Sequence, residues 1–529
     1  MEPGAFTRRK CPCCKNPWST VGESQGCERE CLKIEVPDRR NFGLDPGNLD
    51  LSVRPQDNFF LFGNGKWIAN NPCPNEYPSW NTFRILADQN LTRLKELLTE
   101  LSTSEEKFES GSETDKVMKF YSSYCDESAI EAAGLPPVFR SLVALCHAAI
   151  NPTDKLARLH SEFGLFACFR FYSMPDKDDS NLTLGSFSQG GLGMPDREYY
   201  FADDKLDKRE KYLAYIEKLL HLMGEGGIGV YADEEPLSCR ARAERVFAIE
   251  KAIAGAHMTR VELRDPHATW NKMTPSEFNA LARRQPATWA SYLTKGPSVG
   301  TIDFEAYLVK MGKGHTKVNV ANKAALQQVA SVPTMANFCD YLAFHACNAF
   351  ASDLSKGFVE AHFDFHERTC KGTKEQKERW KQGIAQLENA IGDALSKQYI
   401  AKYSSESTKV AALNIVSEVR EALKSRLQEV DWMSDSTRAE AIKKLNAFRV
   451  KIGFPDPHAW TDYTGLIIGA DHFANSVAAR RHLFGLDVAR MDKPTDKDRW
   501  FMFPHQVNAY YVSATVSQPC ANLFILTTS

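Results

Sequence analysis

Three long stretches of the chain repeat apolar residues at the spacing of an amphipathic α-helix. They cover residues 85–102, 375–399 and 409–430. Side chains three and four positions apart share one face of a helix, so each stretch presents an apolar stripe that is expected to face the protein core. The stripes consist of Leu91, Leu94, Leu97, Leu98 and Leu101; Trp380, Ile384, Leu387, Ile391 and Leu395; and Val410, Leu413, Val416, Val419, Leu423 and Leu427.

A further helix is predicted over residues 273–283, where Thr274 precedes Glu277 by three positions as in a capping box. Alternating apolar residues, the pattern of a half-buried strand, are scarce. The clearest strand candidates are residues 181–189, 317–322, 448–454 and 507–513. The sequence predicts a mainly α fold with minor β structure.

Composition excludes several classes of protein. A chain of 529 residues, 43% of them hydrophobic, suffices for two to four domains or one large composite core. Its 65 basic and 67 acidic residues give a net charge of −2. This balance argues against a nucleic-acid-binding protein. No apolar run reaches the length of a transmembrane segment, and the first residues lack the apolar core of a secretory signal. We expect a soluble, cytoplasmic protein.

Five of the 14 cysteines fall within the first 31 residues. Cys11, Cys14, Cys27 and Cys31 have the spacing of two thiolate pairs, which could close a tetrahedral zinc site. The alternative is an irregular, Cys-rich tail over residues 1–52 that binds no metal. The other nine cysteines occur singly and are predicted to be buried small apolar residues.

A second possible metal site lies in the stretch AHFDFHER, where His362 and His366 stand four positions apart. Histidines at this spacing on a helix can share one zinc ion. Phe363 stands where H-E-x-x-H would place its glutamate, however, so two histidines beside core phenylalanines are the favoured interpretation. The chain has no G-x-S-x-G, P-loop or dinucleotide glycine motif.

Five ordered stretches resemble segments of the neprilysin family of zinc metallopeptidases, and the likeness is greatest to its bacterial oligopeptidase O branch. They are QDNFFLFGNGKWIANNPCPNEYPSWNTF (56–83), GLGMPDREYY (191–200), RVELRDPHATWNKMT (260–274), VDWMSDSTRAEAIKKLNAFRVKIGFPD (430–456) and RWFMFPHQVNAYY (499–511). The resemblance implies the large multi-helix cap domain of the neprilysin-type fold over residues 53–500. Residues 501–529 would be a stub of a truncated thermolysin-like catalytic domain.

The resemblance also implies a site. In this family an edge strand containing N-A-Y-Y holds an extended peptide substrate, and Asn508 and Ala509 match its two binding residues. Zinc is bound by a later H-E-x-x-H helix and a downstream glutamate. These 529 residues contain no H-E-x-x-H. We therefore expect no catalytic zinc and no hydrolysis by this chain, and a poorly anchored end after about Trp500.

Three functions remain open at this point. The first is a zinc metalloendopeptidase of short peptides, of which this chain is a truncated form. The second is a non-catalytic short form that binds peptides or a partner protein. The third is an independent metal-binding protein built on His362 and His366 or on the tail cysteines.

Overall fold

The computed structural model describes residues 45–104, 108–228, 239–284, 289, 293, 295, 300–314 and 316–512, and the backbone of residues 522–523. The chain forms two compact units, Met1–Pro74 and Asn75–Ser529. In the first unit the described residues form the 3-10 helix η1 (Pro46–Asn48) and helix α1 (Phe59–Asn70). The Asn58 side chain caps α1 by accepting a hydrogen bond from the Leu61 N–H at 3.0 Å. The Cys-rich stretch, with Cys11, Cys14, Cys27 and Cys31, lies outside the described residues.

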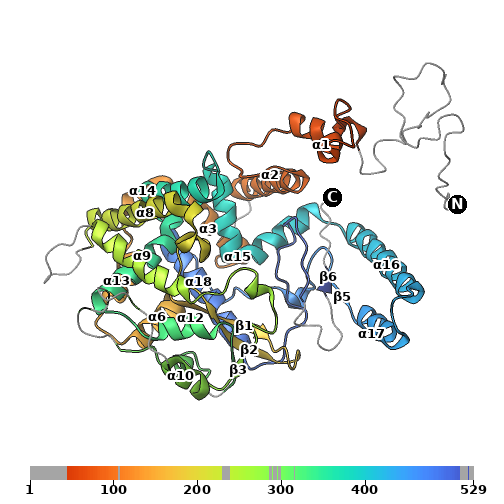
Figure 1. The fold of residues 1–529 in the computed structure, drawn as a ribbon. Helices are drawn as coiled ribbons and strands as arrows, with labels where there is room; N and C mark the ends of the chain where they lie inside the picture. The colour runs from red at the N-terminus through yellow and green to blue at the C-terminus, as the bar shows by residue number, and fades with distance from the viewer. Residues whose placement is uncertain are drawn as a thin grey trace, which may run out of the picture. The chain divides into compact units, whose positions relative to one another are not determined.

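The second unit is mainly helical, as predicted (Figure 1). Its α-helices are α2 (Thr82–Thr103), α3 (Glu113–Cys125), α4 (Glu127–Ala133), α5 (Pro137–His147), α6 (Pro152–Phe163), α7 (Glu198–Phe201), α8 (Leu206–Glu225), α9 (Cys239–Gly255), α10 (Pro275–Arg283), α11 (Phe304–Lys310), α12 (Lys323–Ala330), α13 (Met335–Phe350), α14 (Lys356–His362), α15 (Arg379–Tyr403), α16 (Glu406–Glu429), α17 (Asp435–Asn446) and α18 (His472–Arg490). Short 3-10 helices are η2 (Asp203–Lys205), η3 (Glu262–Arg264), η5 (Ala351–Asp353) and η7 (Pro457–Ala459), and η6 (Phe363–Thr369) is a π-helix.

A small sheet lies among these helices, in the order β1-β2-β4-β3 (Figure 1). Strands β1 (Phe169–Pro175) and β2 (Thr183–Gln189) are antiparallel, with Phe171 opposite Phe187. Strand β4 (Val318–Val320) runs parallel to β2, and β3 (Lys272–Met273) runs antiparallel to β4. The predicted strands at 181–189 and 317–322 are therefore confirmed. The stretch 448–454 contributes only β5 (Arg449–Val450), which pairs with β6 (Asn522–Leu523).

Two apolar clusters form the core of this unit. The larger cluster surrounds the sheet and includes α5, α6, α8, α9 and α13. The smaller one joins α2, α3 and α15, where Leu94, Leu97 and Leu98 meet Ile384 and Leu387. Two of the predicted helical stripes therefore lie in this core. Helix α10 begins with the predicted capping box between Thr274 and Glu277.

The third predicted stripe forms a helix but is mostly exposed. In α16 only Val416 of the six stripe residues is buried, whereas Val410 and Val419 are 47% and 53% exposed. Helix α17 packs against α16 (Figure 1). The buried cluster here contains only Ala412, Val416 and Ile452, so the described residues leave most of the stripe uncovered.

The stretch GLGMPDREYY has a structural role. The Tyr200 hydroxyl donates a hydrogen bond to the buried carboxylate of Glu250 at 2.7 Å and accepts one from the Met194 N–H at 3.2 Å. A Cβ at position 193 would overlap the Tyr212 hydroxyl, which also donates to Glu250. Glycine is required there by this close approach.

Among the described residues, no single helix is both long enough and apolar enough to cross a membrane. The bent pair α4 and α5 meets the criterion together by length and composition.

Candidate functional site

Asn508 and Ala509 lie in a segment without regular secondary structure near the end of the described chain, and both are exposed. The strand predicted over residues 507–513 is not a regular strand as far as it is described, because only Tyr511 takes part in a β-bridge. The Asn508 side-chain oxygen accepts a hydrogen bond from the Ala509 N–H at 2.9 Å. The Asn508 N–H donates a hydrogen bond to the Gln506 carbonyl at 3.1 Å. Within the described residues, the side-chain NH₂ group of Asn508 and the backbone carbonyls of Asn508 and Ala509 form no hydrogen bond. The segment therefore offers donors and acceptors to a ligand.

The residues just before this segment are firmly anchored, contrary to the expectation of a loose end after Trp500. His505 is buried, and its Nε2 atom lies 2.7 Å from Glu388 Oε1 on α15. Its Nδ1 atom lies 3.2 Å from the Ser396 hydroxyl, and its carbonyl accepts a hydrogen bond from the Asn90 side chain at 2.8 Å. Hydrogen bonds of buried groups are costly to break, which explains the anchoring.

A second anchor is the contact of Phe503 with α15 beside a kink in that helix. Ile391 has non-helical backbone angles within this helix, and the Phe503 ring packs against the adjacent Gly392 so closely that a Cβ there would overlap it. The smaller core cluster thus extends to the residues that carry Asn508. The expected loose end is therefore contradicted at Phe503 and His505, whereas residues 513–521 and 524–529 lie outside the described residues. The expectation rested on the family resemblance, which does not reveal contacts with α15 more than 100 positions away.

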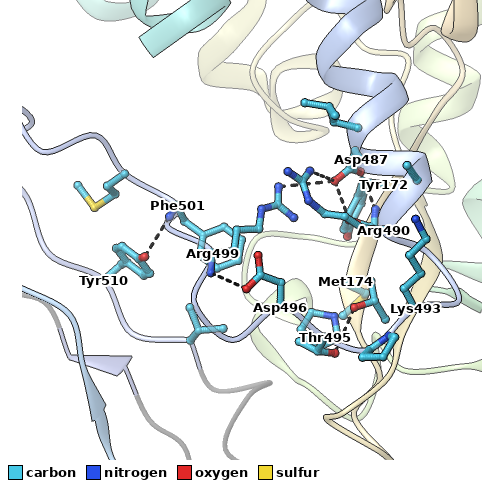
Figure 2. Close-up of a pocket in the computed structure, with 18 residues that line it drawn as sticks. Tyr172, Met174, Asp487, Arg490, Lys493, Thr495, Asp496, Arg499, Phe501 and Tyr510 are labelled. Atoms are coloured by element: carbon cyan, nitrogen blue, oxygen red, sulfur yellow. Dashed lines mark hydrogen bonds and ion pairs between the residues drawn. The ribbon is translucent and has the colours of Figure 1, made fainter. Parts of the chain in front are cut away.

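Beside this segment is a cavity of about 810 Å³, which we call the C-terminal cavity (Figure 2). Its wall comes from four places: the end of β1, the start of β2 at Thr183, the end of α18, and residues 493–512. The lining includes apolar and aromatic groups of Tyr172, Met174, Pro175, Leu486, Phe501 and Tyr510. The Tyr510 hydroxyl accepts a hydrogen bond from the Phe501 N–H at 3.0 Å, and burial raises the pKa of Tyr510 to about 12.

Charged residues line the same cavity. Asp487 of α18 accepts hydrogen bonds from the Ser173 hydroxyl at 2.6 Å and from the Ser173 N–H at 2.7 Å, which joins α18 to β1. Arg490 and Arg499 both approach Asp487, at 3.7 and 3.6 Å (Figure 2). Burial, followed by the charge of Arg499, lowers the pKa of Arg490 below its usual value.

Two further contacts hold the turn that carries Arg499. Asp496 accepts hydrogen bonds from the N–H groups of Asp498 and Arg499 at 2.9 and 3.2 Å. Lys451 donates to the Arg499 carbonyl at 2.7 Å, and burial lowers the pKa of Lys451 to about 8. The backbone of Arg499 is therefore fixed beside the cavity.

A second cavity, of about 890 Å³, is lined by residues 164–166 after α6 and by residues of β1, β2, α3, α13, α15 and α18, and we call it the α18 cavity. Tyr172 and Asp487 line both cavities. The α18 cavity also contains amide groups of Asn348, Gln386 and Asn389. The two cavities therefore meet at the end of β1.

The described residues do not fit a catalytic zinc ion. No group of three or more His, Cys, Asp or Glu side chains among them could hold a metal. His362 and His366 lie with ring centroids 4.4 Å apart, but His366 Nε2 is 2.9 Å from Asn348 Oδ1. Partial burial lowers the pKa of these two half-buried histidines to about 4 and about 3, so both are neutral at pH 7.

Arg490, Arg499 and Asp487 were not predicted as site residues. The sequence holds no signal for them, because charged residues near a helix end are common on solvated surfaces. Their arrangement depends on the turn after α18 and on the contact of Asp487 with Ser173, 314 positions away.

Comparison with known proteins extends these observations. A family model described as Peptidase family M13 matches residues 55–455. Endothelin-converting enzyme 1 of Rattus norvegicus is 28% identical over 485 residues, which are 88% of this chain and 60% of that protein. Neprilysin-3 of Drosophila melanogaster is 26% identical and is covered to 59%. The chain thus spans about 60% of the length of these relatives.

Solved structures show the same fold. Zinc metalloprotease Zmp1 of Mycobacterium tuberculosis, in complex with an inhibitor, matches with a TM-score of 0.79 and 26% identity, over 92% of this chain and 69% of that one. PepO from Lactobacillus rhamnosis has a TM-score of 0.72 at 16% identity and supports the fold alone. Because the family match covers most of the chain, this protein belongs to peptidase family M13, the neprilysin family of zinc metallopeptidases.

Proposed function

We propose that this chain supplies the peptide-binding part of an M13 zinc metalloendopeptidase that acts on short peptides. Asn508 and Ala509 hold the main chain of an extended peptide by strand-like hydrogen bonds. The C-terminal cavity takes a neighbouring part of the same peptide. The observation that carries the proposal is an exposed, anchored backbone segment bordering a cavity of about 810 Å³.

Pre-organisation supports this assignment. Because Pro504 and His505 are buried, the segment that follows them starts from a fixed point. A ligand that pairs with a fixed segment loses less binding free energy to the ordering of the protein. A cavity of several hundred Å³ with apolar walls and a few polar groups is typical of a small-ligand site.

The zinc-dependent step is not assigned to these residues. A bound zinc ion would polarise a water molecule for attack on a peptide bond. The 529 residues contain no H-E-x-x-H, and the described donors do not fit the ion. We therefore propose that this chain binds short peptides without cleaving them.

The test is a binding titration of the purified 529-residue chain. A fluorescent, N-acetylated pentapeptide amide without charged side chains is titrated, and its anisotropy is followed. Saturable binding is expected, and Asn508→Ala should weaken it about two- to tenfold, the effect of one or two lost hydrogen bonds. Asn414→Ala is the matched control, because Asn414 is an exposed asparagine on α16.

A parallel assay with a quenched fluorescent peptide tests the second half of the proposal. No cleavage is expected from this chain. Cleavage that a zinc chelator abolishes would contradict the proposal, and so would an absence of saturable binding.

A further inference from the structure

The guanidinium groups of Arg490 and Arg499 meet at a single carboxylate oxygen in the C-terminal cavity. Arg490 Nη1 lies 3.7 Å and Arg499 Nη2 lies 3.6 Å from Asp487 Oδ1 (Figure 2). That oxygen already accepts the Ser173 hydroxyl hydrogen bond at 2.6 Å. Both arginine contacts are too long for hydrogen bonds. Asp487 is therefore hydrogen-bonded to Ser173, and its single negative charge only partly neutralises the two positive charges of Arg490 and Arg499.

The two side chains retain unused hydrogen-bond donors. Each guanidinium has five N–H donors in a planar fork. Within the described part of the chain, neither guanidinium donates a hydrogen bond, although each arginine side chain is only 31% exposed. Like charges held together beside one carboxylate favour an added anion.

The other charged groups of the cavity do not cancel this excess. Asp496 accepts two backbone hydrogen bonds of its own turn. Lys493, which is exposed, adds a third basic side chain, so three cations stand against two carboxylates in the lining. The cavity therefore favours a ligand with one negative charge.

The shape and chemistry of the lining identify the kind of anion. A guanidinium fork matches the two oxygens of a carboxylate. Apolar walls from Tyr172, Met174, Leu486 and Phe501 suit the carbon skeleton next to that group. Asn508 and Ala509 directly precede Tyr510, which lines the cavity, so a peptide bound along them comes within reach of it.

We propose that the C-terminal cavity is a carboxylate subsite, in which Arg490 and Arg499 bind a carboxylate of a short peptide held along Asn508 and Ala509. The carboxylate is either the peptide's C-terminus or an Asp or Glu side chain. This inference rests on the proposed peptide-binding function. It makes Arg490 and Arg499 specificity-determining residues that select acidic peptides.

The test uses the full 529-residue chain and three labelled pentapeptides of one length. One is the neutral amide, one is its free C-terminal acid, and one is the amide with a single Glu. At least one acidic peptide should bind at least about tenfold more tightly than the neutral amide. Hydrogen bonds between charged groups contribute enough binding free energy for a change in affinity of this size. The stronger of the two identifies the source of the carboxylate.

Variants separate this subsite from a general charge effect. The double variant Arg490→Gln with Arg499→Gln should abolish the preference for the acidic peptide over the neutral amide. The double lysine variant keeps both charges, and should recover only part of the preference because it lacks the planar forks. Arg481→Gln, an exposed arginine on the same helix, is the matched control and should change nothing. Thermal unfolding of each variant shows that the fold is retained.

Equal affinity for the three peptides would overturn the carboxylate subsite while leaving the proposed function intact. A preference that survives the double glutamine variant would also overturn it. Failure of all three peptides to bind would overturn both proposals.

Discussion

His505 and Glu388 join the end of the described chain to the middle of α15, with 2.7 Å between His505 Nε2 and Glu388 Oε1. His505 stands three residues before Asn508 and is 2% exposed. This pair is therefore the link through which the helical core positions the proposed peptide-binding segment.

Replacing His505 with alanine should loosen that segment. The change removes hydrogen bonds to Glu388 and Ser396 and leaves both partners poorly satisfied, at a cost of about 1–3 kcal/mol in unfolding free energy. Urea unfolding measures the loss, and limited proteolysis should reveal new cleavage within residues 499–512. His267→Ala, at an exposed histidine, is the control. Unchanged proteolysis of the His505 variant would show that the anchor lies elsewhere.

Adding one methyl group at Gly392 should also be destabilising. A Cβ at this position would overlap the Phe503 ring, so Gly392→Ala should cost about 1–3 kcal/mol despite the better helix propensity of alanine. Gly485→Ala in α18 has no neighbouring atom within 4 Å of the new Cβ and should instead raise stability by up to about 1 kcal/mol.

A double-mutant cycle tests the cause of the Gly392 effect. With Phe503→Leu, the cost of Gly392→Ala should change by at least about 0.5 kcal/mol, because the two side chains share one space. Additive costs in chemical denaturation would mean that Phe503 does not fill the kink of α15.

Acid should destabilise the fold before its carboxylates titrate. Burial lowers the pKa of His147, His257 and His362 to about 4, and that of His160 and His366 to about 3. In the unfolded chain histidine titrates near about 6.5, so unfolding takes up protons below that pH. Stability should be highest above about pH 6.5 and should fall as the pH drops toward about 4.

The histidine assignment is checked by urea unfolding between about pH 7 and about pH 4.5. His362→Gln removes one such group and should reduce the loss of unfolding free energy over this range by up to about 2 kcal/mol. His221→Gln is the control, since the side chain of His221 is 56% exposed on α8. If the unfolding free energy of the His362 variant falls with pH as steeply as that of the unchanged chain, His362 does not cause the acid sensitivity.

The helical elements were the most predictable part of this molecule. The stripe of α2 and the capping box of α10 are local signals, and both elements form where the pattern placed them. Which stripe is covered is not local. The α16 stripe is as regular as that of α2, yet Val419 is 53% exposed. Among the described residues, only Ala412 and Val416 of α16 are buried in an apolar cluster.

The candidate site was predictable in part. Asn508 and Ala509 could be proposed from family resemblance, and the segment that carries them is exposed. Arg490 and Arg499 could not, since they are nine positions apart and meet only through the turn between them and through Asp487. Periodicity carries no information about such a turn.

Amide hydrogen exchange shows whether Asn508 and Ala509 form the peptide-binding edge. The 529-residue chain is compared with and without a saturating neutral pentapeptide amide. We predict slower exchange confined to fragments that cover residues 506–512 and the lining of the C-terminal cavity, and loss of this protection in Asn508→Ala. Protection of α14 or the α16–α17 pair, with none at residues 506–512, would contradict it.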